Sequence, residues 1–171
     1  PYKPRPILSK VARQRESPQI TKECALVVID LYNCDFEGGK LSVQKDRLLE
    51  RVPATWGYKA YQAIQPTNQL IGLFRDNGLP IFFSTKDFEQ SQKDGNATLR
   101  PRKIAKAEDY HNIPEIDFRP TDNLVKKLRA SVFFNTGLND QLARLDVANL
   151  FIVGESTSGC IRASVVDAFS L

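Results

Sequence analysis

Residues 24–31 read CALVVIDL, a short apolar run that is rich in β-branched residues and bounded by charge. A run of this kind is typical of a strand buried on both faces of a parallel sheet. Residues 80–85 (PIFFST) and 149–154 (NLFIVG) have the same character, and residues 123–127 (NLVKK) form a weaker fourth candidate. We therefore expect these four segments to be strands of one sheet.

Helical patterns lie between these strands. One helix is expected over residues 66–78, with Pro66 at its first position and Gly78 at its C-terminal end. Two further helices are expected over residues 138–145 and from about Ser158 onward. The apolar positions expected to be buried on these helices are Leu70, Ile71 and Phe74; Leu138, Leu142 and Leu145; and Ile161, Val165 and Phe169. Strands that alternate with helices predict an α/β fold with three layers and a doubly wound, mostly parallel sheet.

The chain length and composition fit one domain with a core of its own. With 171 residues, 42% hydrophobic and 26% charged, the chain resembles an ordinary soluble globular protein. We expect an N-terminal arm over residues 1–22 and a single domain over residues 23–171. No apolar run is long enough to span a bilayer, and the arm lacks the apolar centre of a secretory signal.

The charge and the cysteines exclude several kinds of protein. The net charge of +4 is concentrated in the arm and in residues 101–107, and neither segment interleaves aromatic residues with basic ones. We therefore expect solvated charge and no nucleic-acid or membrane partner. Three cysteines without regular spacing argue against a disulfide scaffold and favour a cytoplasmic location.

Polar residues that can carry chemistry stand at the ends of the predicted strands. Asp30, residues 85–87, Lys127 and the 154–160 loop all follow such a strand. Ligands of open parallel sheets bind beyond the carboxyl ends of the strands, so we expect these residues to gather at one edge.

Cys160 has the setting of a nucleophile, in the stretch FIVGESTSGCIRAS of residues 151–164. At a helix N-terminus the free N–H groups stabilise a thiolate and can hold a developing oxyanion. The alternative is a small buried cysteine that only packs. Cys24 and Cys34 lack this setting, and we interpret both as structural.

Asp30 and Lys127 each have an ordinary alternative as well. Asp30 either caps the turn that follows its strand or is held for proton transfer in a partly dry site. Lys127 either is a surface lysine or stabilises an anionic partner.

Three segments together resemble the isochorismatase-like cysteine hydrolase superfamily, and most of all its N-carbamoylsarcosine amidohydrolase branch. They are ALVVIDLYNCDF, KLRASVFFNTGLNDQL and FIVGESTSGCIRASVVDAF. The resemblance implies that Asp30, Lys127 and Cys160 form a catalytic triad. It also implies a cis peptide bond between Glu155 and Ser156 and an oxyanion hole made by the N–H groups of Ser156 and Cys160.

The resemblance also bears on cofactors and on the extent of the fold. Nicotinamidases of the superfamily place histidines after an aspartate that corresponds to Asp87, but here no histidine follows nearby, and the only one in the chain is His111. We expect neither a metal nor another cofactor, and Cys160 argues against vinyl-ether cleavage. Family members continue past the last helix, so we expect the C-terminal part of the fold to be missing from this chain.

These observations predict hydrolysis of a linear amide or N-carbamoyl C–N bond of a small molecule through a thioester. A maleamate or ureidoacrylate amidase, or a catalytically silent scaffold, are the alternatives. We expect a homo-oligomer, either a dimer or a tetramer. The candidates for the wall of the substrate pocket are Tyr32, Asn33, Phe36, Trp56 and Arg162.

Overall fold

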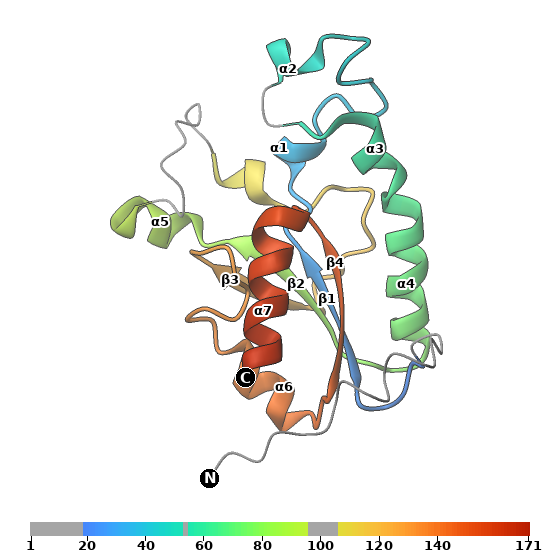
Figure 1. Cartoon of the computed structure of the whole chain (residues 1–171), viewed down its shortest axis with the longest axis vertical. Helices are drawn as coiled ribbons and strands as arrows, with labels where there is room; N and C mark the ends of the chain where they lie inside the picture. Colours follow the sequence, from blue (N-terminus) through green and yellow to red (C-terminus); the bar gives the residue numbers. More distant parts are fainter. Residues whose placement is uncertain (1–18, 53–54, 96–105) are drawn as a thin grey trace, which may run out of the picture.

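The computed structural model describes residues 19–52, 55–95 and 106–171 (Figure 1). The expected arm up to residue 18, and most of the basic segment 101–107, lie outside the described residues. The main elements are β1 (Cys24–Ile29), α1 (Asn33–Phe36), α2 (Leu48–Arg51), α3 (Gly57–Gln62), α4 (Ile64–Asp76), β2 (Ile81–Lys86), α5 (Phe88–Asp94), η1 (Ala107–Tyr110), β3 (Asn123–Lys127), α6 (Leu138–Arg144), β4 (Asn149–Gly154), η2 (Thr157–Ile161) and α7 (Arg162–Ser170). All four predicted strands are confirmed.

The four strands form one parallel sheet in the order β3-β2-β1-β4. Strand β1 lies inside the sheet, and each of its six residues is buried, as its unbroken apolar sequence predicts. Since all strands run the same way, their carboxyl ends share one edge, where Asp30 follows β1 and Lys127 ends β3.

The alternation of side chains along β1 divides the core between two faces. Cys24, Leu26 and Val28 belong to a cluster that contains Ile71 and Phe74 of α4. The intervening residues of β1 belong to a second cluster, which includes side chains of β3 and α6 and is packed against η2 and α7. Figure 1 shows α6 and α7 in front of the sheet and α4 apart from them at its side. The sheet is thus covered on both faces, as expected for a doubly wound α/β fold.

Helix α4 begins two residues earlier than predicted and ends near the predicted stop. Pro66 is its third residue, a position where the missing N–H is harmless because the first turn has no acceptors for it. Leu145, predicted on the buried face of the 138–145 helix, follows the end of α6 and is half-exposed.

The prediction for the buried face of the last helix is wrong at two of its three positions, while Ile161 is partly buried and packs against the core. Val165 is 47% exposed and Phe169 is 90% exposed. The buried residue of α7 is Ser164, whose Oγ accepts a hydrogen bond from the Val132 N–H at 3.0 Å, and Ala168 packs against the core nearby. Small residues therefore bring α7 close to the sheet, and the larger apolar side chains point elsewhere. Across the described ranges, no helix is long and apolar enough to cross a membrane.

Candidate active site

Asp30 is a buried carboxylate at the end of β1, 4% exposed. Its φ of 53° lies in the left-handed region, which is uncommon for a residue other than glycine. Oδ1 accepts hydrogen bonds from Ser84 Oγ at 2.6 Å and from the Tyr32 hydroxyl at 2.8 Å. The backbone N–H of Asp30 in turn donates to Ser84 Oγ at 3.2 Å. The carboxylate is therefore held from two sides, and its second oxygen is left for another partner.

Lys127 supplies that partner and also reaches the cysteine. Its Nζ lies 2.6 Å from Asp30 Oδ2 and donates to Cys160 Sγ at 3.4 Å and to the Arg129 carbonyl at 3.3 Å. An ammonium has three donors, and these contacts use all of them. Lys127 is 6% exposed, whereas Lys126 points to the opposite face of the strand and is exposed. The structure thus brings the three predicted residues together.

The loop that carries Cys160 is tied to the end of β1. The Glu155 N–H donates to the Ile29 carbonyl at 3.0 Å, and the Glu155–Ser156 peptide bond is cis. The Ser156 carbonyl accepts from the N–H groups of Gly159 and Ile161, at 3.0 and 3.2 Å. Cys160 lies in the π-helical turn η2, just before the α-helical residues of α7.

The Cys160 thiol does not have the lowered pKa that its place before a helix predicts. Burial and the negative charge of Asp30 raise the pKa of Cys160 to about 11, although Lys127 acts in the opposite direction. Desolvation disfavours the thiolate more than the helix and the ammonium favour it. The resting site therefore holds a protonated thiol near neutral pH, and it needs a base to form the nucleophile.

The predicted pocket residues have different positions. The Tyr32 hydroxyl donates a hydrogen bond to Asp30, and the half-exposed Trp56 donates its backbone N–H to the Asp35 carbonyl at 2.8 Å. Burial and Asp30 raise the pKa of Tyr32 well above its ordinary value, so its hydroxyl remains a donor. The other three candidates lie elsewhere: the Asn33 side chain donates to the Glu108 carbonyl, Phe36 packs on the α4 side of the core, and Arg162 is exposed.

Two functional features escape reasoning from the sequence. One is Ser84, a small polar residue within the apolar strand β2, whose hydroxyl orients Asp30. The other is Asp35, a buried carboxyl of α1 whose charge contributes to the raised pKa of Glu155. A polar residue inside an apolar strand is a usable signal for Ser84, but nothing in the sequence indicates Asp35.

Asp87, which the family resemblance compares with an aspartate of nicotinamidases, lies just before α5. Asp87 caps α5, and its Oδ1 accepts from the Gln90 N–H at 3.0 Å. In the part of the chain that the structure describes, no group of three or more His, Cys, Asp or Glu side chains is placed to hold a metal ion.

Known proteins with similar sequences include ureidoacrylate amidohydrolases. The enzyme RutB of Agrobacterium fabrum is 41% identical over 63 residues, which cover 37% of this chain and 28% of that relative. Its counterpart in Pseudomonas savastanoi pv. phaseolicola is 25% identical over 186 aligned residues, which cover 95% of this chain and 72% of the relative. The match to the first of these relatives thus spans less than a third of its length.

Solved structures share the fold. An N-carbamoylsarcosine amidase from Thermoplasma acidophilum has a TM-score of 0.60 at 23% identity, covering 86% of this chain and 76% of its own. An isochorismatase family protein from Burkholderia thailandensis has a TM-score of 0.66 at 21% identity, covering 90% of this chain and 75% of its own. The family profile described as isochorismatase domain matches residues 24–171, from the start of β1 onward. The chain therefore belongs to the isochorismatase family.

Proposed function

We propose that this chain is a cysteine-dependent amidohydrolase that cleaves a linear amide or N-carbamoyl C–N bond of a small molecule. The observation that carries the proposal is the position of the Lys127 ammonium, which contacts both the Asp30 carboxylate and the Cys160 sulfur. Nucleophile, base and cation are the groups that acyl transfer through a thioester requires.

The first step is attack by sulfur. Asp30, which shares the Lys127 ammonium with the thiol, accepts the thiol proton as Cys160 attacks the carbonyl carbon of the substrate. Because the pKa of the resting thiol is about 11, this base is needed near neutral pH. Lys127 keeps its charge throughout and stabilises whichever of the two groups is anionic.

The remaining steps reuse the same carboxyl group. The N–H groups of Ser156 and Cys160 are assigned to the oxyanion, following the family resemblance. As the C–N bond breaks, protonated Asp30 gives its proton to the leaving nitrogen and ammonia departs. Asp30 then takes a proton from water, which attacks the thioester, and returns that proton to the departing sulfur, so that the acid is released and the Cys160 thiol is regenerated.

The choice of substrate rests on the relatives. The likeness to the N-carbamoylsarcosine branch favours an N-carbamoyl compound, and the ureidoacrylate amidohydrolases favour a ureido compound as the second candidate. Because these side chains supply the nucleophile, base and cation, the proposed reaction uses no metal or other cofactor. A homo-oligomeric assembly and a cytoplasmic location stay predictions.

The test is ammonia release from a panel of primary amides and N-carbamoyl compounds, with Cys160→Ala as the control. We expect release that this variant abolishes, together with an acyl-enzyme that hydroxylamine traps as a hydroxamate. A panel that yields no ammonia, with no adduct on Cys160, would support the silent-scaffold alternative instead.

A further inference from the structure

The two oxygens of the Asp30 carboxylate have different partners. Oδ1 accepts hydrogen bonds from the Tyr32 hydroxyl at 2.8 Å and from Ser84 Oγ at 2.6 Å. Oδ2 lies 2.6 Å from Lys127 Nζ, which also donates to Cys160 Sγ at 3.4 Å. One oxygen therefore meets two hydroxyl donors, and the other shares an ammonium with the sulfur that must lose its proton.

The hydrogen bonds at Oδ1 have a fixed direction. The Ser84 hydroxyl has one proton, and its oxygen accepts from the Asp30 N–H at 3.2 Å, so its proton points to Oδ1. Burial and the charge of Asp30 raise the pKa of Tyr32 well above its ordinary value, so the phenol keeps its proton and donates it as well. A proton placed on Oδ1 would disrupt one of these two hydrogen bonds, whereas Oδ2 can take a proton without losing either.

The backbone directs the Tyr32 side chain back to Asp30. The Tyr32 N–H donates to the Asp30 carbonyl at 2.9 Å, which closes a three-residue turn. A side chain two residues further along can therefore reach the carboxylate of the residue that begins the turn. Tyr32 is 6% exposed, so water competes little for the hydrogen bond between its hydroxyl and Oδ1.

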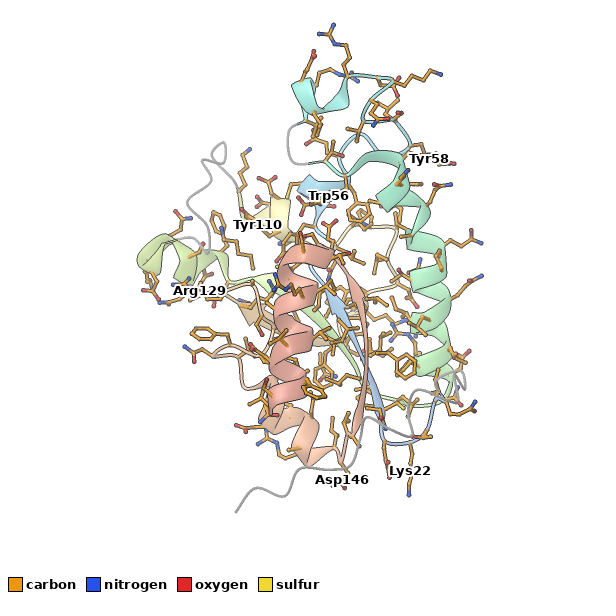
Figure 2. The ribbon with its side chains drawn as sticks, in the orientation of Figure 1. Lys22, Trp56, Tyr58, Tyr110, Arg129 and Asp146 are labelled. Carbon is orange, nitrogen blue, oxygen red and sulfur yellow. The ribbon has the colours of Figure 1, made fainter. Side chains whose placement is uncertain are left out.

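Helix η1 and the residues that follow it hold Tyr32 in place. Tyr32 forms an isolated antiparallel bridge with Asn112, and the next N–H, that of Asn33, donates to the His111 carbonyl at 2.9 Å. The rings of Tyr110 and Tyr32 meet edge to face, with their centroids 5.3 Å apart. Figure 2 shows Tyr110 on η1, beside α1. These contacts do not involve the Tyr32 hydroxyl, so a phenylalanine can occupy the same place.

We propose that Tyr32 is a positioning residue, whose hydroxyl reserves Oδ1 of Asp30 so that the proton of the Cys160 thiol passes to Oδ2. Ser84 acts on the same oxygen from β2. In this step the S–H bond breaks, an O–H bond forms at Oδ2, and a sulfur electron pair forms the bond to the carbonyl carbon, whose oxygen takes the negative charge. The inference rests on the proposed amidohydrolase function.

The test measures how fast iodoacetamide alkylates Cys160 at different pH values, with peptide-level mass spectrometry as the readout. The reactive form is the thiolate, and burial and Asp30 raise the pKa of the resting thiol to about 11. Below that pH the thiolate forms by giving its proton to ionised Asp30, and its fraction then does not depend on pH. At lower pH Asp30 already carries a proton, and the rate falls. The midpoint of this acid limb therefore reports how strongly Asp30 holds a proton, and no substrate is needed.

The titratable groups that act on Asp30 do not obscure this limb. They include Tyr32 and Cys160, whose pKa values are raised above their ordinary ones, and Lys127 of β3, which is paired with Asp30 as an ammonium. Glu155, in the loop after β4, has a pKa that burial raises to about 9. Between about pH 4 and pH 8, Asp30 is the member of this group that changes its charge.

Tyr32→Phe keeps the ring and removes the donor. A donor favours the charged form of a carboxylate, so its loss should move the acid limb upward by about one pH unit and raise the rate on the plateau. At pH values above the limb, kcat for ammonia release should fall roughly tenfold with little change in KM, because Oδ1 then competes for the proton. A stronger base that supports slower turnover indicates lost positioning. A hydroxyl needed only for stability would leave the limb in place.

Two further variants control the comparison. Tyr58→Phe makes the same chemical change at an exposed tyrosine of α3, which Figure 2 shows on the other side of α1 from Tyr110, and it should leave the limb and kcat unchanged. Ser84→Ala removes the other donor at Oδ1 and should move the limb in the same direction as Tyr32→Phe. If Tyr32→Phe does not fold, Ser84→Ala decides in its place, and an unmoved limb there overturns the assignment of the proton to Oδ2.

The outcomes separate this inference from the proposed function. An acid limb at the wild-type position in Tyr32→Phe, or a kcat equal to that of the wild type, would overturn the positioning role. Failure of the proposed function appears differently, as a wild type that releases no ammonia from any amide. The alkylation limb then decides alone: an upward shift in Tyr32→Phe supports the inference, and an unmoved limb overturns it.

Discussion

The Lys127 ammonium lies 2.6 Å from Asp30 Oδ2, and both side chains are almost completely removed from solvent. A buried pair of this kind persists when other contacts satisfy its remaining donors and acceptors. Here the hydroxyls of Ser84 and Tyr32 donate to the remaining oxygen of Asp30. Cys160 Sγ and the Arg129 carbonyl accept the remaining hydrogen bonds of the Lys127 ammonium. The pair is therefore one connected network with the proposed nucleophile.

Replacing Lys127 should abolish turnover. Lys127→Met removes the cation that contacts both Asp30 and Cys160, and the loss of one such charge partner typically lowers the rate by about 10²–10³. Lys126→Met is the matched control, because that side chain is exposed on the other face of β3. Ammonia release by the two variants gives the comparison.

Stability must be measured beside activity. Leaving Asp30 buried without its partner destabilises a protein by about 3–5 kcal/mol. Adding Asp30→Asn to Lys127→Met should recover much of that stability and none of the activity. Near-normal turnover by Lys127→Met, or a larger loss in Lys126→Met, would refute the triad assignment.

Ser84→Ala should weaken both the fold and the catalytic step. It removes a donor to Asp30 Oδ1 in a fully buried setting, which costs about 1–3 kcal/mol of unfolding free energy. If Ser84 positions the base, kcat falls while KM changes little. Urea unfolding and steady-state kinetics measure the two effects.

Ser91→Ala provides the comparison for a buried hydroxyl away from the triad. Its Oγ donates to the Phe88 carbonyl within α5, so stability should fall and kcat should not. Equal kcat in wild type and Ser84→Ala would reduce Ser84 to a structural role.

The sequence predicts the sheet well because β1, β2 and β4 are apolar runs of strand length, and burial on both faces demands such runs. The gathering of Asp30 and Lys127 follows from parallel strands alone. The orientation of α7 was mispredicted because Val165 and Phe169 suggest an apolar face, whereas close packing on the sheet selects Ser164. The raised pKa of Cys160 could not be predicted, since it depends on burial and on the distance to Asp30.

Glu155→Gln should change how stability depends on pH. In the unfolded chain Glu155 loses its proton near pH 4.5, while in the folded protein it keeps the proton up to about pH 9. Between these values the folded state binds more protons, so the stability of the wild type falls as pH rises. Glutamine does not titrate. The free energy of unfolding of the variant, relative to that of the wild type, should therefore rise by about 1 kcal/mol or more between roughly pH 5 and pH 8.

Urea unfolding at several pH values measures this difference, with Glu23→Gln as the exposed control. Parallel stability curves for wild type and Glu155→Gln would mean that Glu155 is ionised in the folded protein.

Gly154→Ala should damage the fold and the site together. Gly154 ends β4 opposite Ile29 and has a φ of 119°, a conformation that side chains rarely adopt. An added Cβ would overlap the Ile29 carbonyl oxygen, the same atom that accepts the Glu155 N–H. The backbone must then shift where Asp30 and the Cys160 loop are joined. We expect a loss of more than about 1 kcal/mol in unfolding free energy, together with reduced ammonia release.

The matched substitution is Gly72→Ala in the middle of α4, where an added Cβ meets nothing within 4 Å. Alanine in a helix interior is favoured over glycine by about 0.5–1 kcal/mol, so this variant should be more stable than the wild type and equally active. The two glycine variants should change the free energy of unfolding in opposite directions. This difference distinguishes a specific requirement for glycine at position 154 from a general effect of adding a methyl group. If Gly154→Ala and the wild type have the same midpoint of urea unfolding, the close approach of β4 to Ile29 is not needed. The loop that carries Cys160 is then positioned by its other contacts.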